Sequence, residues 1–292
     1  TIAPLVAASF LLGDQILSSD AIASLSEMER LAYYAEEASA VQGPFVGLAL
    51  AFFLLAGIVA VIKLPKILGE ADTAGGYAEV LRNRKLAFGA IGIFVYVGAE
   101  VALGSYMVNY GLSLDILEDV KTHGILAAMA GVAAVMKGVD VSGLDAKGIL
   151  GALLTFYWGG AMLGRFAGSA LMSRVRPLTL LTWAAAMAFL LITGSVLSSG
   201  VAALLLLLGV GFCNSIMFPT IFTLAIEDLG EAKPQGSGIL CTAIVGGAFI
   251  PPAVGALVDG FGFGWAFVLP MACYLYIAWF AGKLVPMASG DS

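Results

Sequence analysis

Long apolar runs constrain this chain more than any other feature of its sequence. A helix needs about 20 predominantly apolar residues to cross the hydrocarbon core of a bilayer, and seven runs of about that length occur in the 292 residues. Charged residues make up only 12% of the chain, about half the share of an average soluble domain, so a soluble fold would lack the polar surface to cover these runs. The runs therefore predict an all-α polytopic membrane protein. They comprise residues 44–64, 86–110, 148–172, 178–196, 201–226, 237–258 and 264–284.

Three further segments complete the predicted domain organisation. Residues 1–13 are apolar but too short to cross a bilayer, which predicts the end of a longer membrane helix. A secretory signal peptide is the alternative, but the segment lacks a positively charged start and a cleavage pattern. Residues 14–43 are acidic and predict an extracytoplasmic loop with a short surface helix. Residues 125–136 are apolar but too few to span, which indicates an interfacial or re-entrant segment.

Lysine and arginine are unevenly distributed among the loops. Residues 65–85 contain Arg82, Arg84 and Lys85, and basic residues also follow the third, fifth and seventh runs. The alternate loops have basic residues that are outnumbered by acidic ones, or none at all. Because cytoplasmic loops are enriched in Lys and Arg, residues 65–85 are predicted to form a cytoplasmic central loop and residues 285–292 a cytoplasmic tail. The predicted location is the cell inner membrane.

The residue types that build common catalytic and metal sites are scarce. His123 is the only histidine, which excludes zinc sites with two imidazoles and histidine relays. Cys213, Cys241 and Cys273 each lie in an apolar run without a second cysteine nearby, unlike a zinc site or a disulfide framework. No P-loop string for ATP hydrolysis is present, and a net charge of −6 without a basic stripe excludes a nucleic-acid binder. The sequence therefore predicts no enzyme, no cofactor and no metal site.

Glu100 is the most informative polar residue within the predicted spans. It lies midway along residues 86–110, where an ionised carboxylate facing lipid would cost about 2.5–3.5 kcal/mol, so it must face protein or water. Helical spacing places Tyr96 and Met107 on the same stripe, with Asn109 close beside it. Hydroxyl, carboxylate and amide groups suit a polyol, so this stripe predicts contact with a substrate or a proton. A structural bond to a neighbouring helix is the alternative.

Asn214 and Pro219 lie deep in the span at residues 201–226. Proline removes a backbone hydrogen bond and frees the carbonyl about one turn earlier, so a kink is predicted beside the Asn214 amide, as in the broken helices of transporters. A satisfied hydrogen bond between helices is the alternative for Asn214. Pro251 and Pro252 repeat the proline pattern in the next span.

Tyr157 and Arg165 lie in the span at residues 148–172. The Tyr157 ring suits stacking on a sugar ring, or anchoring at lipid headgroups. Arg165 lies toward the cytoplasmic end, where it sets the topology, or pairs with a neighbouring helix end and locks one conformation. The span is also rich in glycine, which predicts close helix packing, with a mobile gate as the alternative.

Four sequence strings occur in the order found in a known transporter family. They are YVGAE at 96–100, YWGGAMLGR at 157–165, NSIMFPTIF at 214–222 and AIVGGA at 243–248. With them the chain resembles, along nearly its whole length, the fucose–galactose–glucose–proton symporter family of the major facilitator superfamily. The resemblance implies two six-helix halves with sugar bound between them near the bilayer midplane.

On the family plan, residues 1–13 correspond to the end of the fifth helix, residues 44–64 to the sixth, and residues 86–284 to helices seven to twelve. The first four helices have no counterpart in the chain. In fucose-transporting members the acids assigned to proton coupling lie in that part, so the resemblance leaves the cation site unassigned.

The resemblance implies sugar contact by Glu100 and Asn109 on the seventh helix and by Asn214 and Phe218 on the tenth. Fucose-transporting members have a tyrosine at the position of Phe218, and the strings look more like those of glucose, galactose or N-acetylglucosamine members. The predicted function is cation-coupled hexose uptake by alternating access, with a proton or sodium ion as partner and the missing half of the transporter as the facing wall. A non-transporting receptor or scaffold on the same half-fold is the alternative.

Overall fold

A computed structural model describes residues 25–62, 76–116, 124–137 and 146–288. The chain divides into two compact units, residues 1–71 and 72–292, and each is described by itself. The helix end predicted at residues 1–13 lies outside the described residues.

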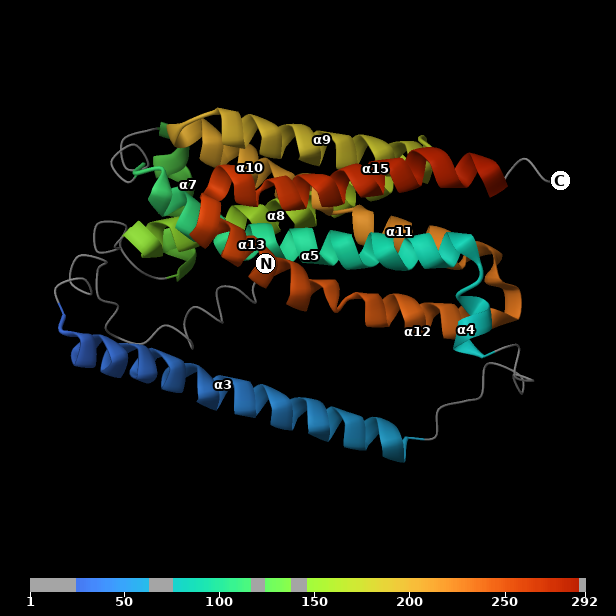
Figure 1. The fold of residues 1–292 in the computed structure, drawn as a ribbon, viewed down its shortest axis with the longest axis horizontal. Coiled ribbons are helices and arrows are strands. Elements are labelled where there is room, and N and C mark those ends of the chain that lie inside the picture. The colour runs from blue at the N-terminus through green and yellow to red at the C-terminus, as the bar shows by residue number, and fades with distance from the viewer. Residues whose placement is uncertain (1–24, 63–75, 117–123, 138–145, 289–292) are drawn as a thin grey trace. The chain divides into compact units, whose positions relative to one another are not determined.

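The described part of the first unit is dominated by one helix, α3 (Glu27–Val61) (Figure 1). Ser26 caps this helix, because its Oγ accepts a hydrogen bond from the backbone N–H of Glu29 (3.4 Å). The Glu29 carboxylate in turn accepts from the backbone N–H of Ser26 (3.0 Å), and these bonds lower the pKa of Glu29. This reciprocal capping box starts a helix. The chain is therefore helical from Glu27 to Val61. The part of the predicted loop that the structure describes is thus a long helix from Glu27 onward instead of a loop with a short surface helix, and residues 14–24 lie outside the described residues.

The second unit is a bundle of long apolar helices. Among the described residues, five helical stretches are long and apolar enough to cross a membrane, and they agree within a few residues with the last six predicted runs. Figure 1 shows these helices side by side, with α5 packed against α13 and α15 and with α10 packed against α8 and α9. The stretches are α5 (Arg84–Ser113), α8 (Ala146–Met172), α9 (Pro177–Leu197), the run from α10 (Gly200–Asn214) to α13 (Gly246–Phe261), and the run from α14 (Phe263–Ala266) to α15 (Val268–Ala288).

The run from α10 to α13 folds back on itself. Its 62 residues would extend about 93 Å as a straight helix, three times the thickness of the hydrocarbon core. The fold comes at η2 (Glu227–Ala232), where Gly230 has a φ of 50° that glycine adopts without strain. One arm contains α10 and α11 (Met217–Ile226), and the other contains α12 (Lys233–Ala243) and α13. Each arm is long enough for one crossing, which resolves the run into two predicted spans.

Two shorter helices flank the bundle. α4 (Tyr77–Val80) occupies part of the predicted central loop, while residues 65–75 of that loop lie outside the described residues. α7 (Gly124–Lys137) matches the short apolar segment expected at residues 125–136 and packs against α8. At about 1.5 Å per residue, α7 is too short to cross a bilayer.

Glycines let the helices of this unit approach closely. A Cβ at Gly211 would collide with the backbone carbonyl oxygen of Tyr157, and a Cβ at Gly164 would lie 2.6 Å from the carbonyl oxygen of Phe212. Both contacts join α8 to α10, so the close packing predicted for the glycine-rich span at residues 148–172 is made against α10. Close backbone approach is the usual role of small residues between membrane helices.

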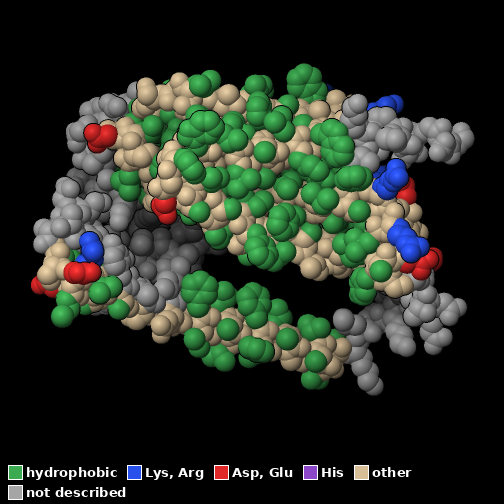
Figure 2. All heavy atoms as spheres, in the orientation of Figure 1, with side chains coloured by type: hydrophobic (Ala, Val, Ile, Leu, Met, Phe, Trp, Pro, Cys, Tyr) green, Lys and Arg blue, Asp and Glu red, His purple; other side chains and the backbone are tan. Residues whose placement is uncertain are grey.

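The outer surface of the second unit is apolar along the helices and basic at one end. Large exposed side chains along the helices include Phe166, Trp183 and Phe249, and Figure 2 shows this apolar surface continuing across the face in view. In the same view the Lys and Arg side chains of the unit gather at the end where α4 and η2 lie. An apolar flank, with the Lys and Arg side chains in view gathered at one end, is the surface expected of helices embedded in lipid.

Candidate functional site

Asn214 is the centre of a buried hydrogen-bond cluster that joins four helices. Its side chain is fully buried (0% exposed) at the end of α10. Its Oδ1 accepts from the Tyr274 hydroxyl of α15 (2.7 Å) and its Nδ2 donates to the Tyr157 hydroxyl of α8 (2.8 Å). The backbone carbonyl of Asn214 accepts from the Tyr96 hydroxyl of α5 (2.9 Å). We call these four residues the asparagine cluster; all of them are buried, and their hydrogen bonds offset the cost of burying polar groups.

The local sequence explains why the cluster forms at this point. Helix α10 ends at Asn214 and α11 begins at Met217, and a helix end leaves backbone carbonyls without a partner in the helix. Tyr96 supplies that partner to the Asn214 carbonyl. Pro219 is the third residue of α11, in the first turn, where a missing N–H costs little. The interruption at residues 215–216 thus lies about one turn before Pro219.

Pro251 and Pro252 behave differently. They lie inside α13, whereas the interruption between α12 and α13 falls earlier, at Ile244 and Val245. Each proline removes a backbone donor that would bond to the carbonyl four residues earlier, so the two prolines weaken the first turns of α13 rather than mark the interruption.

The cluster lies at the middle of the bundle in the direction of the helix axes. Its residues and Glu100 each lie within about one helical turn of the midpoint of their apolar stretch or hairpin arm. In transporters with two helical halves, substrate sites lie near this depth, between the halves.

Glu100 borders the cluster on α5. The Tyr157 hydroxyl donates to its backbone carbonyl (3.3 Å), and its half-buried carboxylate interacts with the Tyr96 hydroxyl and with the positive charge of Arg165 on α8. The antiparallel register of α5 and α8, which places Gly104 beside Trp158, brings Arg165 to about the same depth as Tyr96. The helix register therefore places the exposed Arg165 opposite the middle of α5 rather than at a helix end, where its positive charge acts on the Glu100 carboxylate across a distance.

Aromatic rings extend the cluster toward α11. Phe218 is half-buried, its ring is stacked on Phe222 with centroids 5.9 Å apart, and its centroid lies 6.4 Å from that of Tyr96. Tyr157 packs edge-on against Trp158 at 5.3 Å. The site thus combines one carboxylate with a set of aromatic surfaces.

Asn109 does not join this group. It lies nine residues after Glu100 on α5, which is about 13 Å further along the axis and half a turn out of phase. Its side chain is exposed, whereas Met107, on the same stripe as Glu100, is buried. The sequence placed Asn109 beside the stripe, but the structure separates it from the carboxylate.

Tyr274 is the member of the cluster that the sequence analysis did not identify. It is fully buried and bonds to Asn214, although 60 residues separate the two in the chain. One signal was present in the sequence, because Tyr274 lies mid-span, whereas membrane tyrosines are enriched at the interfaces. A buried tyrosine hydroxyl usually has a hydrogen-bond partner, so its position alone indicated a polar contact.

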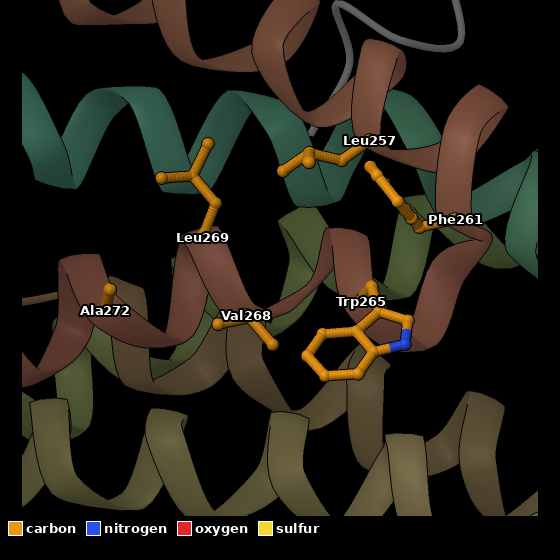
Figure 3. A pocket seen from close by; sticks show the side chains of 6 residues that line it. All are labelled: Leu257, Phe261, Trp265, Val268, Leu269 and Ala272. Carbon is orange, nitrogen blue, oxygen red and sulfur yellow. The ribbon is translucent and has the colours of Figure 1, made fainter.

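A separate groove lies between α13 and α15 and has a volume of about 620 Å³. Figure 3 shows its six lining side chains, and none of the cluster residues is among them. A sugar has several hydroxyl groups that need hydrogen-bond partners, and the six lining side chains offer a single polar group, the indole N–H of Trp265. The groove is therefore no substitute for the site at Glu100. It is lined by Leu257, Phe261, Trp265, Val268, Leu269 and Ala272.

Comparison with known proteins identifies sugar transporters as relatives. The glucose/galactose transporter of Brucella abortus biovar 1 (strain 9-941) is 42% identical over 246 residues, which cover 84% of this chain and 53% of that protein. A putative glucose/galactose transporter of Helicobacter pylori (strain J99) is 38% identical over 89% of this chain and 57% of its own length. The L-fucose-proton symporter of Escherichia coli (strain K12) is 26% identical over 90% of the chain and 56% of that protein. The chain thus spans about half the length of these relatives.

A solved structure gives the same answer for the fold. The major facilitator superfamily transporter FucP, in its outward conformation, superposes with a TM-score of 0.63 and 26% sequence identity, covering 96% of this chain and 63% of that one. No family model matches the chain. These relatives agree with the family that the four sequence strings resemble. The order of the helices and their apolar flanks agree with it as well. The chain belongs to the fucose–galactose–glucose–proton symporter family of the major facilitator superfamily.

Proposed function

We propose that the chain forms one wall of a secondary active sugar transporter that takes up a hexose together with a proton by alternating access. The observation that carries this proposal is the mid-membrane carboxylate of Glu100 on α5, which borders the buried tyrosines of the asparagine cluster. In this assignment α3 is the sixth helix, and the helices from α5 to α15 are the seventh to the twelfth. The facing wall is the other six-helix half of the transporter fold.

The relatives support the choice of substrate and ion. Two of them are named as glucose/galactose transporters, at 42% and 38% identity, and the name of the more distant symporter specifies L-fucose and a proton. We therefore assign glucose, galactose or a close hexose such as N-acetylglucosamine as substrate, and a proton rather than sodium as coupling ion.

The chemistry of the site suits a pyranose ring. Sugar hydroxyls donate to a carboxylate in charge-assisted hydrogen bonds, which are roughly twice as strong as neutral ones, so Glu100 is the principal polar contact. Phe218 offers an apolar surface to the C–H face of the ring. Asn109 is exposed, but it lies about 13 Å further along α5 and half a turn out of phase with Glu100, so we do not assign it to the same sugar-binding position.

Two residues act on the site in other ways. The polar atoms of Tyr157 and Asn214 are occupied by one another and by neighbouring groups, so in this conformation both support the wall behind the sugar. Arg165 interacts with the Glu100 carboxylate, and a sugar that binds Glu100 competes with it. Arg165 is thus assigned as a conformational lock that substrate releases.

Uptake into proteoliposomes tests the function. The protein that carries this sequence is reconstituted and supplied with labelled glucose, galactose or N-acetylglucosamine under an imposed proton or sodium gradient. We expect accumulation that depends on the proton gradient, and a rise in KM of about tenfold or more in the Glu100→Gln variant, since a charged hydrogen bond is lost. Glu231→Gln, at an exposed carboxylate in η2, should transport normally.

Each other outcome rejects a specific part of the proposal. Sugar binding without accumulation under either gradient would support the receptor or scaffold alternative. Accumulation driven by sodium alone would refute the proton assignment. An unchanged KM in Glu100→Gln would remove Glu100 from the sugar site.

We further propose that the end of the bundle with α4 and η2 faces the cytoplasm, together with the C-terminus. The basic side chains at this end support the assignment, because positive residues accumulate on the cytoplasmic side. A green fluorescent protein fused after Ser292 should fluoresce in cells, whereas export of the C-terminus would leave it dark and contradict the orientation.

A further inference from the structure

Tyr274 starts a directional chain of hydrogen bonds that ends on the backbone of Glu100. The Tyr274 hydroxyl donates to Oδ1 of Asn214 (2.7 Å), Nδ2 of Asn214 donates to the Tyr157 hydroxyl (2.8 Å), and that hydroxyl donates to the Glu100 carbonyl (3.3 Å). An amide nitrogen only donates and an amide oxygen only accepts. The chain therefore has a single consistent direction, and the orientation of the Asn214 amide is fixed from both sides.

A second branch reaches the side chain of the same glutamate. The Tyr96 hydroxyl donates to the backbone carbonyl of Asn214 (2.9 Å) and also interacts with the Glu100 carboxylate. Because Tyr96 and Glu100 are four residues apart on α5, they occupy one face of the helix. Asn214 is thus connected to Glu100 by two routes. Its side chain leads through Tyr157 to the backbone carbonyl of Glu100, and its backbone carbonyl leads through Tyr96 to the carboxylate of Glu100.

We propose that Tyr274 and Asn214 are positioning residues for Glu100: they fix the carboxylate for the sugar without touching the sugar themselves. The inference rests on the proposed function, in which Glu100 binds the substrate. Both residues are fully buried (0% exposed), so the sugar meets the wall that they hold rather than their own polar atoms. Binding groups need support of this kind, since a site works only when its side chains are held close to the productive geometry.

The same helix supplies a matched control. Tyr276 lies two residues after Tyr274 on α15, and its hydroxyl donates to the carbonyl of Phe88 on α5 (2.9 Å). Phe88 lies twelve residues before Glu100, about 18 Å away along the axis. Removing the Tyr276 hydroxyl therefore takes away a comparable bond between α15 and α5 at a place remote from the carboxylate.

The test measures hexose KM and maximal rate per inserted molecule in the protein that carries this sequence. Tyr274→Phe should raise KM on the order of tenfold, because a displaced binding group loses its alignment with the substrate, whereas Tyr276→Phe should leave KM within about twofold. The two single variants are then combined with Glu100→Gln. Tyr274→Phe should add no further rise in KM in that background, since the carboxylate that it positions is absent.

The outcomes separate positioning from general stabilisation. Equal KM effects of Tyr274→Phe and Tyr276→Phe, or fully additive effects of Tyr274→Phe and Glu100→Gln, would overturn the inference. A raised KM in Glu100→Gln with a normal KM in Tyr274→Phe rejects the positioning role alone, and an unchanged KM in Glu100→Gln rejects the proposed sugar contact itself. If Tyr274→Phe does not reach the membrane, Tyr157→Phe, which removes the last donor in the chain, is measured in the same way against the same criteria.

Discussion

Lys85, in the first turn of α5, lies 2.8 Å from a carboxylate oxygen of Asp228 and 3.0 Å from one of Glu227. The lysine side chain is 10% exposed, whereas the two acids are 52% and 60% exposed. One nearly buried ammonium thus joins the beginning of α5 to the start of η2, directly after α11. This ion pair holds α5 against η2 at the basic end of the bundle.

Replacing Lys85 with methionine should destabilise the protein modestly. The apolar stem keeps its packing, but the two half-exposed carboxylates lose their partner, and such pairs contribute about 1 kcal/mol or less. The thermal midpoint of the detergent-solubilised protein should fall by about 2–4 °C. Arg82→Met, at an exposed basic residue nearby, should leave the midpoint unchanged. Equal losses in the two variants would show that Lys85 acts through net charge alone.

Gly211→Ala should destabilise the bundle more strongly. A Cβ at this position collides with the backbone carbonyl of Tyr157, and overpacking of this kind typically costs about 1–3 kcal/mol. Gly209→Ala is the matched control on the same helix, because its Cβ would meet Leu191 at an ordinary distance of 3.5 Å. That variant should be neutral or stabilising by up to about 1 kcal/mol, since alanine has the better helix propensity. The thermal unfolding midpoints of Gly211→Ala and Gly209→Ala, each compared with the unsubstituted protein, test this prediction. Changes of the same sign in the two variants would refute the close contact at Gly211.

The charges of Glu100 and Arg165 should be energetically coupled. Arg165→Gln removes the positive charge beside a carboxylate in the membrane, where an uncompensated charge is costly. We expect a loss of about 1–2 kcal/mol of stability in Arg165→Gln and recovery of most of it in the double variant with Glu100→Gln. The coupling free energy follows from the unfolding midpoints of the unsubstituted protein, the two single variants and the double variant in a double-mutant cycle. Strict additivity would mean that the two side chains do not interact.

Phe218→Leu should weaken sugar binding with little effect on stability. The substitution keeps an apolar side chain but removes the flat ring stacked on Phe222, so the surface offered to the sugar is smaller. A rise in KM of about fivefold is expected, equivalent to about 1 kcal/mol. Phe249→Leu disrupts a similar stacked pair, which the exposed Phe249 of α13 forms with Phe94 of α5 at 6.3 Å and 27°, and should leave KM unchanged. A larger effect in the control would place the sugar elsewhere.

The helices of the second unit could be predicted from sequence because hydrophobicity is a local property. Each run carries its own transfer free energy, and the spans from residue 86 onward coincide with observed helices within a few residues. The start of α3 was predicted only as a short surface helix within a loop, because an acidic stretch resembles a loop, although Ser26 and Glu29 form a recognisable capping box. Pro219 marked the region of the interruption at residues 215–216, but Pro251 and Pro252 did not coincide with the interruption in their own arm.

The candidate site, like the fold, could be predicted from the sequence only in part. Sequence alone identified Glu100, Tyr96, Tyr157 and Asn214, since polar groups within apolar runs must find partners. It did not determine which partners they find, because those come from residues 57, 60 and 118 positions away from Asn214.

What the sequence by itself determined is where the chain is apolar enough to enter a bilayer and which rare polar groups enter with it. What only the tertiary structure decided is that Tyr274 completes the asparagine cluster and that Asn109 lies apart from Glu100. The physical reason is that hydrophobic transfer adds up residue by residue along the chain, whereas a hydrogen bond needs two groups within about 3 Å, and helix packing alone sets that distance.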